Sequence, residues 1–395
     1  MTLTEFVNVN KIIGEEQAGF RSGYSTHDHI FTLHAIIDLY LNMFNKKQKR
    51  LYCAFIDYSK AFDLVDRALL WNKLLAYNIN GRFMRAIHNI YQNTKACIKL
   101  NNTVSNSFNC NIGVRQGDNL SPLLFSLFIN DFEAFLSEKY NGLRCMENLF
   151  ADISDIDDFE TFLKLYVLLY ADDTIILAES PDELQIALNA LSDYCNQWKL
   201  KINVDKTKII RFSKRKSKTF NYVFHLNNET VELVDSYVYL GTKFSYNGKF
   251  KEAIKKQLLQ AQRALFAIKS KRERLNLPVD IMLDLFDKMI MPILLYGCEI
   301  WGFEDIEAVE NFYRKFLKYV LRLNSQTTNC MVYGETGKKP LMETIKSRMV
   351  CFWHKISVCD NNKLSTKILT FQKKLHEQNL YNSPWLKKIE NILNS

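Results

Sequence analysis

The chain has 395 residues, of which 47% are hydrophobic and 24% charged, and this composition indicates a globular protein with a buried core. Its net charge of +9 suits an acidic partner such as a nucleic acid. Nine cysteines without a Cys-x-x-Cys pair, no signal peptide and no apolar run of ~18 residues exclude secreted and membrane-spanning proteins, so we expect an intracellular protein of the nucleus or cytoplasm.

The first part of the chain is predicted to alternate helices with strands. A helix at 25–45 opens with the capping pattern Ser25-Thr26-His27-Asp28, and a helix at 180–203 opens with Ser180 followed by Pro181. Three more helices are expected in this part, at 61–79, 81–92 and 121–139. The strand and hairpin patterns lie at 51–59, 95–117, 164–178, 206–213 and 236–248.

Strand patterns stop near residue 248, and only helical periodicity follows. The helices expected there span 250–274, 279–296, 304–323, 338–357 and 362–394. The sequence therefore predicts an α+β fold with a domain boundary near residue 248.

Three aspartates stand at the ends of predicted strands. Asp57 ends the strand at 51–59, and Asp172 and Asp173 lie side by side in the turn of the hairpin at 164–178. Nucleotide addition is an in-line displacement at phosphorus, in which two Mg²⁺ ions ~3.5–4 Å apart clamp the attacking and leaving oxygens. Mg²⁺ is held by a few carboxylates together with waters and phosphates. The order of elements and these aspartates predict the palm of a polymerase.

A second aspartate pair, Asp157-Asp158, lies in the acidic segment 147–160, which has no flanking strand pattern. We interpret this pair as a solvated turn in a surface insertion.

Several motifs in a fixed order resemble those of reverse transcriptases of non-LTR (LINE-type) retrotransposons. The match covers roughly residues 13–300 and includes an opening segment, motifs A to E and a thumb-side segment. These are EEQAGFRSGYSTHDHI (15–30), AFIDYSKAFDLVDRALLWNKL (54–74), GVRQGDNLSPLLFSLFINDF (113–132), YADD (170–173), WKLKINVDKTKII (198–210), YLG (239–241) and LYGCEIWG (295–302). The occurrence of these motifs in the right order argues strongly against a chance match.

The resemblance implies a role for individual residues. Asp57, Asp172 and Asp173 would be the catalytic ligands of two Mg²⁺ ions, or of Mn²⁺, with the backbone carbonyl of Tyr58 as a further ligand. Phe62 matches the steric gate against a ribose 2′-OH, and a core aromatic is the alternative. Residues expected to contact the incoming nucleotide or its pyrophosphate are Arg115, Gln116, Gly117 and Lys206. The primer grip would be formed by Tyr239, Leu240 and Gly241. For Arg115 and Lys206, an ordinary surface contact is the alternative.

The implied fold is a right-hand polymerase palm, an antiparallel sheet with packed helices, followed by an all-helical thumb and a C-terminal helical region. The domains expected are residual fingers and a connecting helix at 1–50, a palm at 51–248, a thumb at 249–300 and a helical region at 301–395. Fourteen residues precede Glu15, with Lys11 the only basic one, so we expect incomplete fingers and an N-terminally truncated copy.

The function expected is an RNA-directed DNA polymerase that uses an RNA template, a DNA primer and dNTPs, with weak or absent activity if the fingers are incomplete. One alternative is a non-catalytic nucleic-acid-binding remnant of such an element. Another is a group II intron maturase or similar cellular enzyme, against which LYGCEIWG and GVRQGDNLSP argue. The oligomeric state stays open.

Two weaker patterns have ordinary explanations. The basic runs at 45–50, 213–218 and 269–274 are solvated faces or phosphate contacts, and phosphate contact is favoured for the last. Cys351, His354 and Cys359 lack a fourth ligand for zinc. A helix face formed by Val350, Cys351, Trp353, His354 and Ile356 is the favoured explanation.

Overall fold

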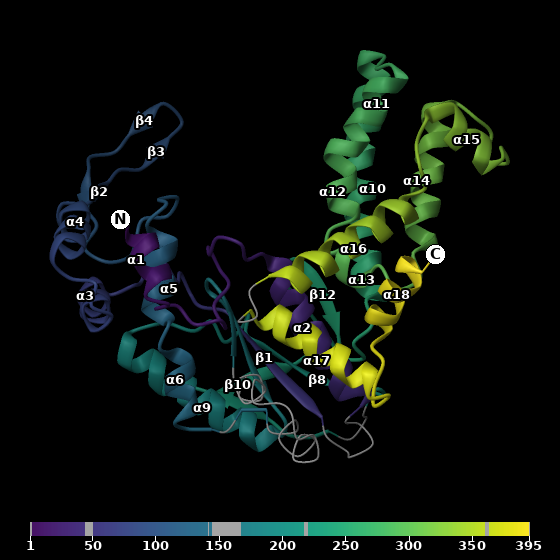
Figure 1. Cartoon of the computed structure of the whole chain (residues 1–395). Coiled ribbons are helices and arrows are strands. Elements are labelled where there is room, and N and C mark those ends of the chain that lie inside the picture. Colours follow the sequence, from purple (N-terminus) through teal and green to yellow (C-terminus); the bar gives the residue numbers. More distant parts are fainter. Residues whose placement is uncertain are drawn as a thin grey trace. The chain divides into compact units, whose positions relative to one another are not determined.

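The computed structural model describes residues 2–43, 50–140, 142–143, 167–216, 220–359 and 363–394 (Figure 1). The acidic segment 147–160 with Asp157-Asp158 lies outside the described residues, as do 45–49 of the first basic run and 217–218 of the second. Within the described part, no helix is long and apolar enough to cross a membrane.

The chain forms two compact units. The first comprises Met1–His29, Lys47–Arg211 and Ser217–Val234, and the second comprises Ile30–Lys46, Phe212–Lys216 and Asp235–Ser395.

A six-stranded sheet forms the centre of the first unit, in the order β6-β7-β1-β8-β10-β9. Its strands are β1 (Leu51–Ile56), β6 (Val167–Tyr170), β7 (Asp173–Ala178), β8 (Lys208–Phe212), β9 (Phe224–Leu226) and β10 (Glu229–Leu233). All six residues of β1 are buried, as expected for a central apolar strand. The predicted antiparallel sheet is wrong in one respect, because β10 pairs with β8 in parallel and the sheet is therefore mixed.

Helices cover this sheet and extend the first unit. They are α1 (Leu3–Val9), α3 (Arg67–Ala76), α4 (Gly81–Gln92), α5 (Ser121–Ile129), α6 (Phe132–Ser137) and α9 (Pro181–Trp198). Helix α9 packs on β1, β7 and β9 through its buried apolar face. Ser180 caps it as predicted, because the Ser180 side chain accepts a hydrogen bond from the Glu183 N–H at 3.1 Å.

Two predicted helices differ from the structure for local reasons. The helix expected at 61–79 begins only at Arg67, because the Asp66 side chain caps it by accepting the Ala68 and Leu69 N–H groups. The helix expected at 121–139 is divided into α5 and α6 at Asn130-Asp131.

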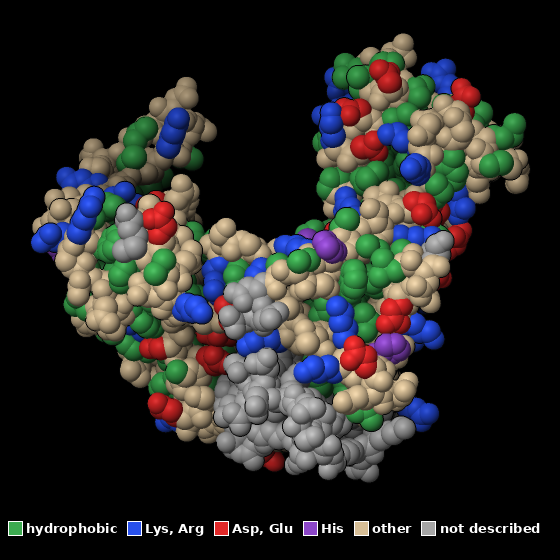
Figure 2. All heavy atoms as spheres, in the orientation of Figure 1, with side chains coloured by type: hydrophobic (Ala, Val, Ile, Leu, Met, Phe, Trp, Pro, Cys, Tyr) green, Lys and Arg blue, Asp and Glu red, His purple; other side chains and the backbone are tan. Residues whose placement is uncertain are grey.

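The predicted hairpin at 95–117 is confirmed as two short ladders. β2 (Lys95–Ala96) pairs with β5 (Phe108–Asn109), and β3 (Lys99–Leu100) pairs with β4 (Thr103–Val104). Figure 2 shows hydrophobic and basic side chains together on this hairpin, and the exposed apolar residues are Ile98, Leu100, Val104 and Phe108.

The second unit contains one hairpin and is otherwise helical. β11 (Ser236–Tyr239) pairs with β12 (Thr242–Ser245), as predicted. Its helices are α2 (Thr26–Asn42), α10 (Lys251–Leu275), α11 (Val279–Leu285), α12 (Met291–Leu294), α13 (Cys298–Trp301), α14 (Glu307–Val320), α15 (Asn329–Thr336), α16 (Leu341–Val358), α17 (Leu364–Glu377) and α18 (Pro384–Leu393). Between α11 and α12 a π-helical turn, Phe286–Ile290, precedes Pro292, which has no N–H for a regular ladder.

Two predictions about the C-terminal helices need correction. The helix expected at 362–394 is two helices, because Pro384 begins α18 after a break at 378–383. The helix expected around Cys351 and His354 is confirmed as part of α16, but its buried face is another one. That face consists of Leu341, Ile345, Met349, Phe352 and Ile356.

Candidate active site at the YADD turn

The register of two strands brings three aspartates to one edge of the sheet. In the antiparallel pairing of β1 with β7, Ile56 lies opposite Thr174. Asp57 therefore follows the last paired residue of β1, and Asp173 precedes its partner on β7. Tyr170 pairs with Asp173 and closes the hairpin, so Ala171 and Asp172 form a two-residue turn. The strands thus place Asp57, Asp172 and Asp173 at the same edge of the sheet.

The three carboxylates influence one another. The pKa of Asp173 is raised to about 6, first because surrounding protein replaces water and then because Asp172 and Asp57 repel its charge. The same two causes, burial and the charge of Asp57, raise the pKa of Asp172, although hydrogen bonding to its own backbone opposes them. The Asp173 residue as a whole is exposed, and its raised pKa means that it keeps its proton to a higher pH than an ordinary aspartate does.

A lysine lies beside Asp57. Lys206 Nζ lies 3.9 Å from Asp57 Oδ2, and both side chains are partly exposed. The segment that carries Lys206 also holds the Asp57 backbone. The Asn203 N–H donates to the Asp57 carbonyl at 2.8 Å, and the Asp57 N–H donates to the Thr207 hydroxyl at 3.2 Å.

The donor set suits a divalent cation of the Mg²⁺ type. All of the candidate side-chain ligands are carboxylate oxygens, which Mg²⁺ prefers, and their mutual repulsion is the kind that a cation relieves. In the described part of the chain, no three His, Cys, Asp or Glu side chains lie close enough together to hold a metal ion. Tyr58, whose carbonyl is a predicted ligand, forms an antiparallel bridge with Ile202 directly after Asp57.

The loop of motif B is joined to the turn after β1. The Val114 N–H donates to the Phe62 carbonyl at 2.8 Å, and the Gly113 N–H donates to the Val65 carbonyl at 2.8 Å. Gln116 Nε2 donates to Asp63 Oδ2 at 3.1 Å. Gln116 is therefore bonded to the residue that follows Phe62, although more than 50 residues separate the two segments along the chain.

The predicted gate residue is half-buried. The Phe62 ring stacks on Phe125 of α5 with centroids 4.7 Å apart. This contact is the one expected of a core aromatic, and it also fixes the ring orientation that a gate requires.

A cavity of about 730 Å³ opens beside the motif B loop. Its lining includes Asp63, Arg67, Lys95, Arg115 and Gln116. The Arg115 guanidinium donates to the Ile90 carbonyl at 2.7 Å, so part of its hydrogen-bonding capacity serves the fold. Gly117 has φ of +81°, and no atom lies within 4 Å of the position that a Cβ would occupy.

The sequence comparisons decide the family. A family model described as "Reverse transcriptase (RNA-dependent DNA polymerase)" matches residues 1–244, which is more than half of the chain. The chain belongs to the reverse transcriptase family. The predicted relation to reverse transcriptases of non-LTR retrotransposons is confirmed, and the family is one of RNA-directed DNA polymerases.

Two curated relatives of this reverse transcriptase come from Drosophila melanogaster. The "Retrovirus-related Pol polyprotein from type-2 retrotransposable element R2DM" is 26% identical over 254 residues, which are 60% of this chain and 22% of the relative. The "Probable RNA-directed DNA polymerase from transposon BS" is 24% identical over 340 residues, which are 84% of this chain and 34% of the relative. The chain thus spans about a fifth to a third of the length of these relatives.

Among solved structures, the telomerase of Candida albicans in complex with a fragment of telomeric RNA is similar to this reverse transcriptase. The match covers all of this chain and 55% of the telomerase chain. The sequence identity is 12% and the TM-score is 0.38.

The predicted primer-grip residues of this reverse transcriptase lie in the second unit, at the turn between β11 and β12. Leu240 and Gly241 have φ of +44° and +81°, as in the two-residue turns that favour hairpins. The Tyr296 hydroxyl donates to the Leu240 carbonyl at 2.9 Å. A Cβ on Gly241 would lie 2.8 Å from the Tyr296 ring, so this turn packs directly on the helical part of its unit.

Sequence reasoning missed the residues that hold the aspartates. Asn203 and Thr207 are part of the quoted segment 198–210, but nothing in the sequence shows that they bond to Asp57. Gln17 is part of the quoted segment 15–30 and received no role, although it is fully buried beside the YADD turn. Gly19, two residues after Gln17, is a local signal of a close backbone approach, but nothing in the sequence shows that the YADD turn is its partner.

Proposed function

We propose that this reverse transcriptase adds dNTPs to the 3′ end of a DNA primer on an RNA template, as the polymerase domain of a non-LTR retrotransposon. The observation that carries the proposal is the register of β1 with β7, which brings Asp57 to the YADD turn. Oxygen ligands that converge from a rigid sheet are what two-metal phosphoryl transfer requires.

Asp57, Asp172 and Asp173 would hold two Mg²⁺ ions, or Mn²⁺, with the Tyr58 carbonyl as an additional ligand. When bound, such ions stabilise the charge that develops on the attacking and leaving oxygens. The raised pKa values of Asp172 and Asp173 support this assignment, because anions that repel each other gain most from a shared cation.

The remaining residues would bind and orient the nucleotide. Phe62, fixed by its stacking on Phe125, would exclude a 2′-OH from the sugar position. Arg115, Gln116 and Gly117 would face the nucleotide and the template base, with the open space at Gly117 allowing a close backbone approach. Lys206 Nζ would give its proton to the leaving pyrophosphate.

We assign residues 51–248 to a palm, 249–300 to a helical thumb, 1–50 to part of the fingers with a connecting helix, and 301–395 to a helical C-terminal region. Tyr239, Leu240 and Gly241 would support the primer 3′ end. The tight turn at Leu240-Gly241 and its bond to Tyr296 suit a rigid support.

Primer extension tests the proposal. The full chain is given an RNA template, a DNA primer, dNTPs and Mg²⁺, and D172N is compared with D193N, which removes an exposed carboxylate on α9. We expect extension by the wild type and D193N, and a loss of at least about 100-fold in D172N. Absence of extension in the wild type, with template–primer still bound, would favour the nucleic-acid-binding remnant instead.

A further inference from the structure

The YADD turn contains an unfavourable backbone conformation. Ala171, its first central residue, has φ of +60°. Glycine is preferred at such a position because an L side chain crowds the backbone there. Asp172 and Asp173 follow directly, so whatever holds Ala171 in this conformation also fixes where their carboxylates point.

The side chain of Gln17 binds both polar backbone groups of Ala171. Gln17 Oε1 accepts the Ala171 N–H at 3.0 Å, and Gln17 Nε2 donates to the Ala171 carbonyl at 3.4 Å. The same Oε1 accepts the Gly19 N–H at 2.8 Å. Gln17 is fully buried, so these groups have no water as a substitute partner.

The backbone around Gln17 extends the sheet up to the turn. The Leu169 N–H donates to the Glu16 carbonyl at 2.8 Å, and the Ala18 N–H donates to the Leu169 carbonyl at 3.0 Å. Gln17 thereby forms a parallel bridge with Leu169 of β6. Gly19 then passes so close that a Cβ there would lie 2.2 Å from the Ala171 nitrogen. Residue 19 must therefore be a glycine, because a Cβ there would clash with the backbone of Ala171.

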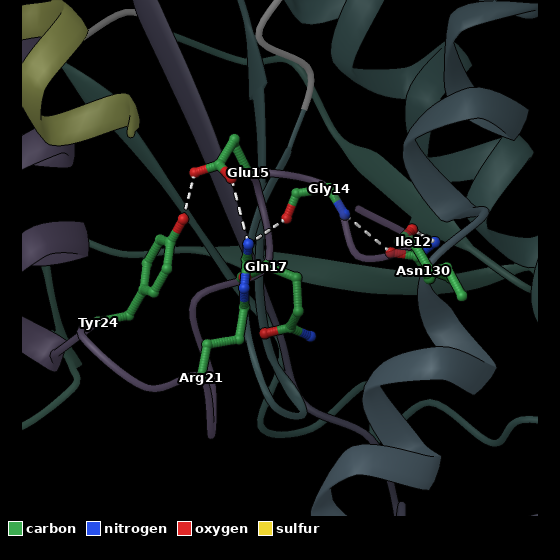
Figure 3. A network of polar contacts seen from close by, with 7 residues as sticks. All are labelled: Ile12, Gly14, Glu15, Gln17, Arg21, Tyr24 and Asn130. Atoms are coloured by element: carbon green, nitrogen blue, oxygen red, sulfur yellow. Dashed lines mark hydrogen bonds and ion pairs between the residues drawn. The ribbon is translucent and has the colours of Figure 1, made fainter. Parts of the chain in front are cut away.

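A separate network holds the Gln17 segment itself (Figure 3). Arg21 Nη1 donates to the carbonyls of Gly14 and Gln17 at 2.6 and 3.0 Å, and Arg21 Nη2 donates to Glu15 Oε1 at 3.2 Å. The Tyr24 hydroxyl donates to the other Glu15 oxygen at 2.5 Å. These hydrogen bonds stabilise the segment and do not involve the YADD turn.

The same segment is also hydrogen-bonded to Asn130, the residue that follows α5. Asn130 Oδ1 accepts the Gly14 N–H at 3.1 Å, and Asn130 Nδ2 donates to the Ile12 carbonyl at 2.8 Å (Figure 3). Gln17 therefore connects this hydrogen-bonded framework to the YADD turn.

We propose that Gln17 is a positioning residue, which holds Ala171 in its left-handed conformation and so aims Asp172 and Asp173. The inference rests on the proposed function, because aiming the carboxylates has a consequence only if they hold the metal ions of the reaction. Gln17 touches the backbone of the turn and none of the reacting atoms.

The first test measures the turn directly. We compare Q17M, which keeps the length of the side chain but removes its acceptor, with Q185M. Gln185 offers a matched control, because it also binds the N–H and the carbonyl of one residue, His225, at 2.8 Å each. We expect the Ala171 amide to exchange with solvent at least about tenfold faster in Q17M and at the wild-type rate in Q185M. Unchanged exchange in Q17M would overturn the proposal.

Two further variants keep this test decisive if Q17M does not fold. Q17E retains an acceptor for the Ala171 N–H, and we expect wild-type protection there. G19A disturbs the same turn without changing Gln17, because its Cβ would clash with the Ala171 nitrogen, and we expect the Ala171 amide to exchange faster in this variant. G334A is the control, because its Cβ has open space, and we expect no change there. Equal exchange in G19A and G334A would contradict the close contact.

The second test measures the consequence for catalysis. In Q17M we expect kcat for nucleotide addition to fall about tenfold or more, with the KM for template–primer unchanged and kcat largely restored in Q17E. Faster exchange at Ala171 without a fall in kcat would overturn the positioning role. If the wild type does not extend primers, the proposed function fails, and amide exchange alone then decides whether Gln17 holds the turn.

Discussion

Lys206 Nζ lies 3.9 Å from Asp57 Oδ2, and the two residues come from segments almost 150 positions apart. The Lys206 side chain is 69% exposed and that of Asp57 33%, so the pair adds little to stability, about 1 kcal/mol or less. A cation placed beside the Asp57 carboxylate is better explained by chemistry at that carboxylate than by stability.

The first prediction concerns this lysine. We expect K206M to lower kcat about tenfold, because the leaving pyrophosphate loses its proton donor, while the melting temperature changes by no more than about 1 °C. Single-turnover primer extension and thermal unfolding measure the two effects. K201M removes an exposed lysine from the same segment and should leave both unchanged. Equal kcat in K206M and K201M would remove Lys206 from the mechanism.

The second prediction follows from the pKa of Asp173, which is raised from the model-compound value of 3.8 to about 6. Between these pH values the folded protein holds the proton more tightly than the unfolded chain does. The free energy of unfolding therefore falls as pH rises from about 4 to about 6. Above about pH 6, Asp173 is ionised and the folded protein is less stable than it is with Asp173 protonated.

D173N removes this penalty. With EDTA present, we expect its melting temperature to exceed that of the wild type by about 1–3 °C at pH 7.5, an effect kept small by solvent screening at this exposed residue. The gain should disappear near pH 4, where wild-type Asp173 is protonated. D193N serves as the control and should show no such gain at pH 7.5. A loss of stability in D173N at pH 7.5 would mean that the carboxylate makes a favourable contact instead.

Much of this site could be predicted from the sequence, because its signals are local. The apolar runs on both sides of YADD predict a buried hairpin, and a two-residue turn fixes which residues stand at its tip. The strand ending at Asp57 has a similarly clear apolar run. The hairpin at 224–233 was missed although its turn, Asn227-Asn228, has the composition of such turns, and both residues have positive φ.

The remaining differences arise from partners that are distant in sequence. Asn130 interrupts the helix expected at 121–139, and its side chain bonds to Ile12 and Gly14, more than 110 residues away. Nothing near Asn130 in the sequence indicates those partners. The parallel pairing of β10 with β8 is missed for the same reason, because periodicity identifies strands but not their neighbours.

The third prediction separates the two explanations of Phe62. F62V would remove the ring that stacks on Phe125 and leave the sugar position more open. We expect the preference for dNTPs over rNTPs to fall by at least about tenfold, with a loss of about 1–2 kcal/mol in the free energy of unfolding. Competition between the two nucleotides in primer extension measures the first effect.

F83V provides the matched control for Phe62. Phe83 is also half-buried at the edge of the core, where its ring contacts Phe6 with centroids 5.6 Å apart. F83V should cost a similar free energy of unfolding and leave sugar selection intact. If both variants kept the wild-type selectivity, Phe62 would be a core aromatic and no gate.

The last prediction uses two glycines of the motif B loop with almost the same backbone conformation. Gly113 and Gly117 have φ of +80° and +81°. A Cβ at Gly113 would lie 2.5 Å from the Asp63 carbonyl oxygen, whereas at Gly117 it would meet nothing within 4 Å. Both substitutions by alanine impose a left-handed conformation on an L residue, but only G113A adds a clash with backbone.

We therefore expect G117A to lower the free energy of unfolding by about 1 kcal/mol and G113A by about 3 kcal/mol, measured by urea denaturation. The difference between the variants isolates the contact of the loop with Asp63, because the conformational cost is common to both. That contact matters for the site, since Asp63 also accepts the hydrogen bond from Gln116 at 3.1 Å. Equal losses in the two variants would show that the motif B loop is free to move away from the turn after β1, and Gln116 would then have no fixed position against the nucleotide.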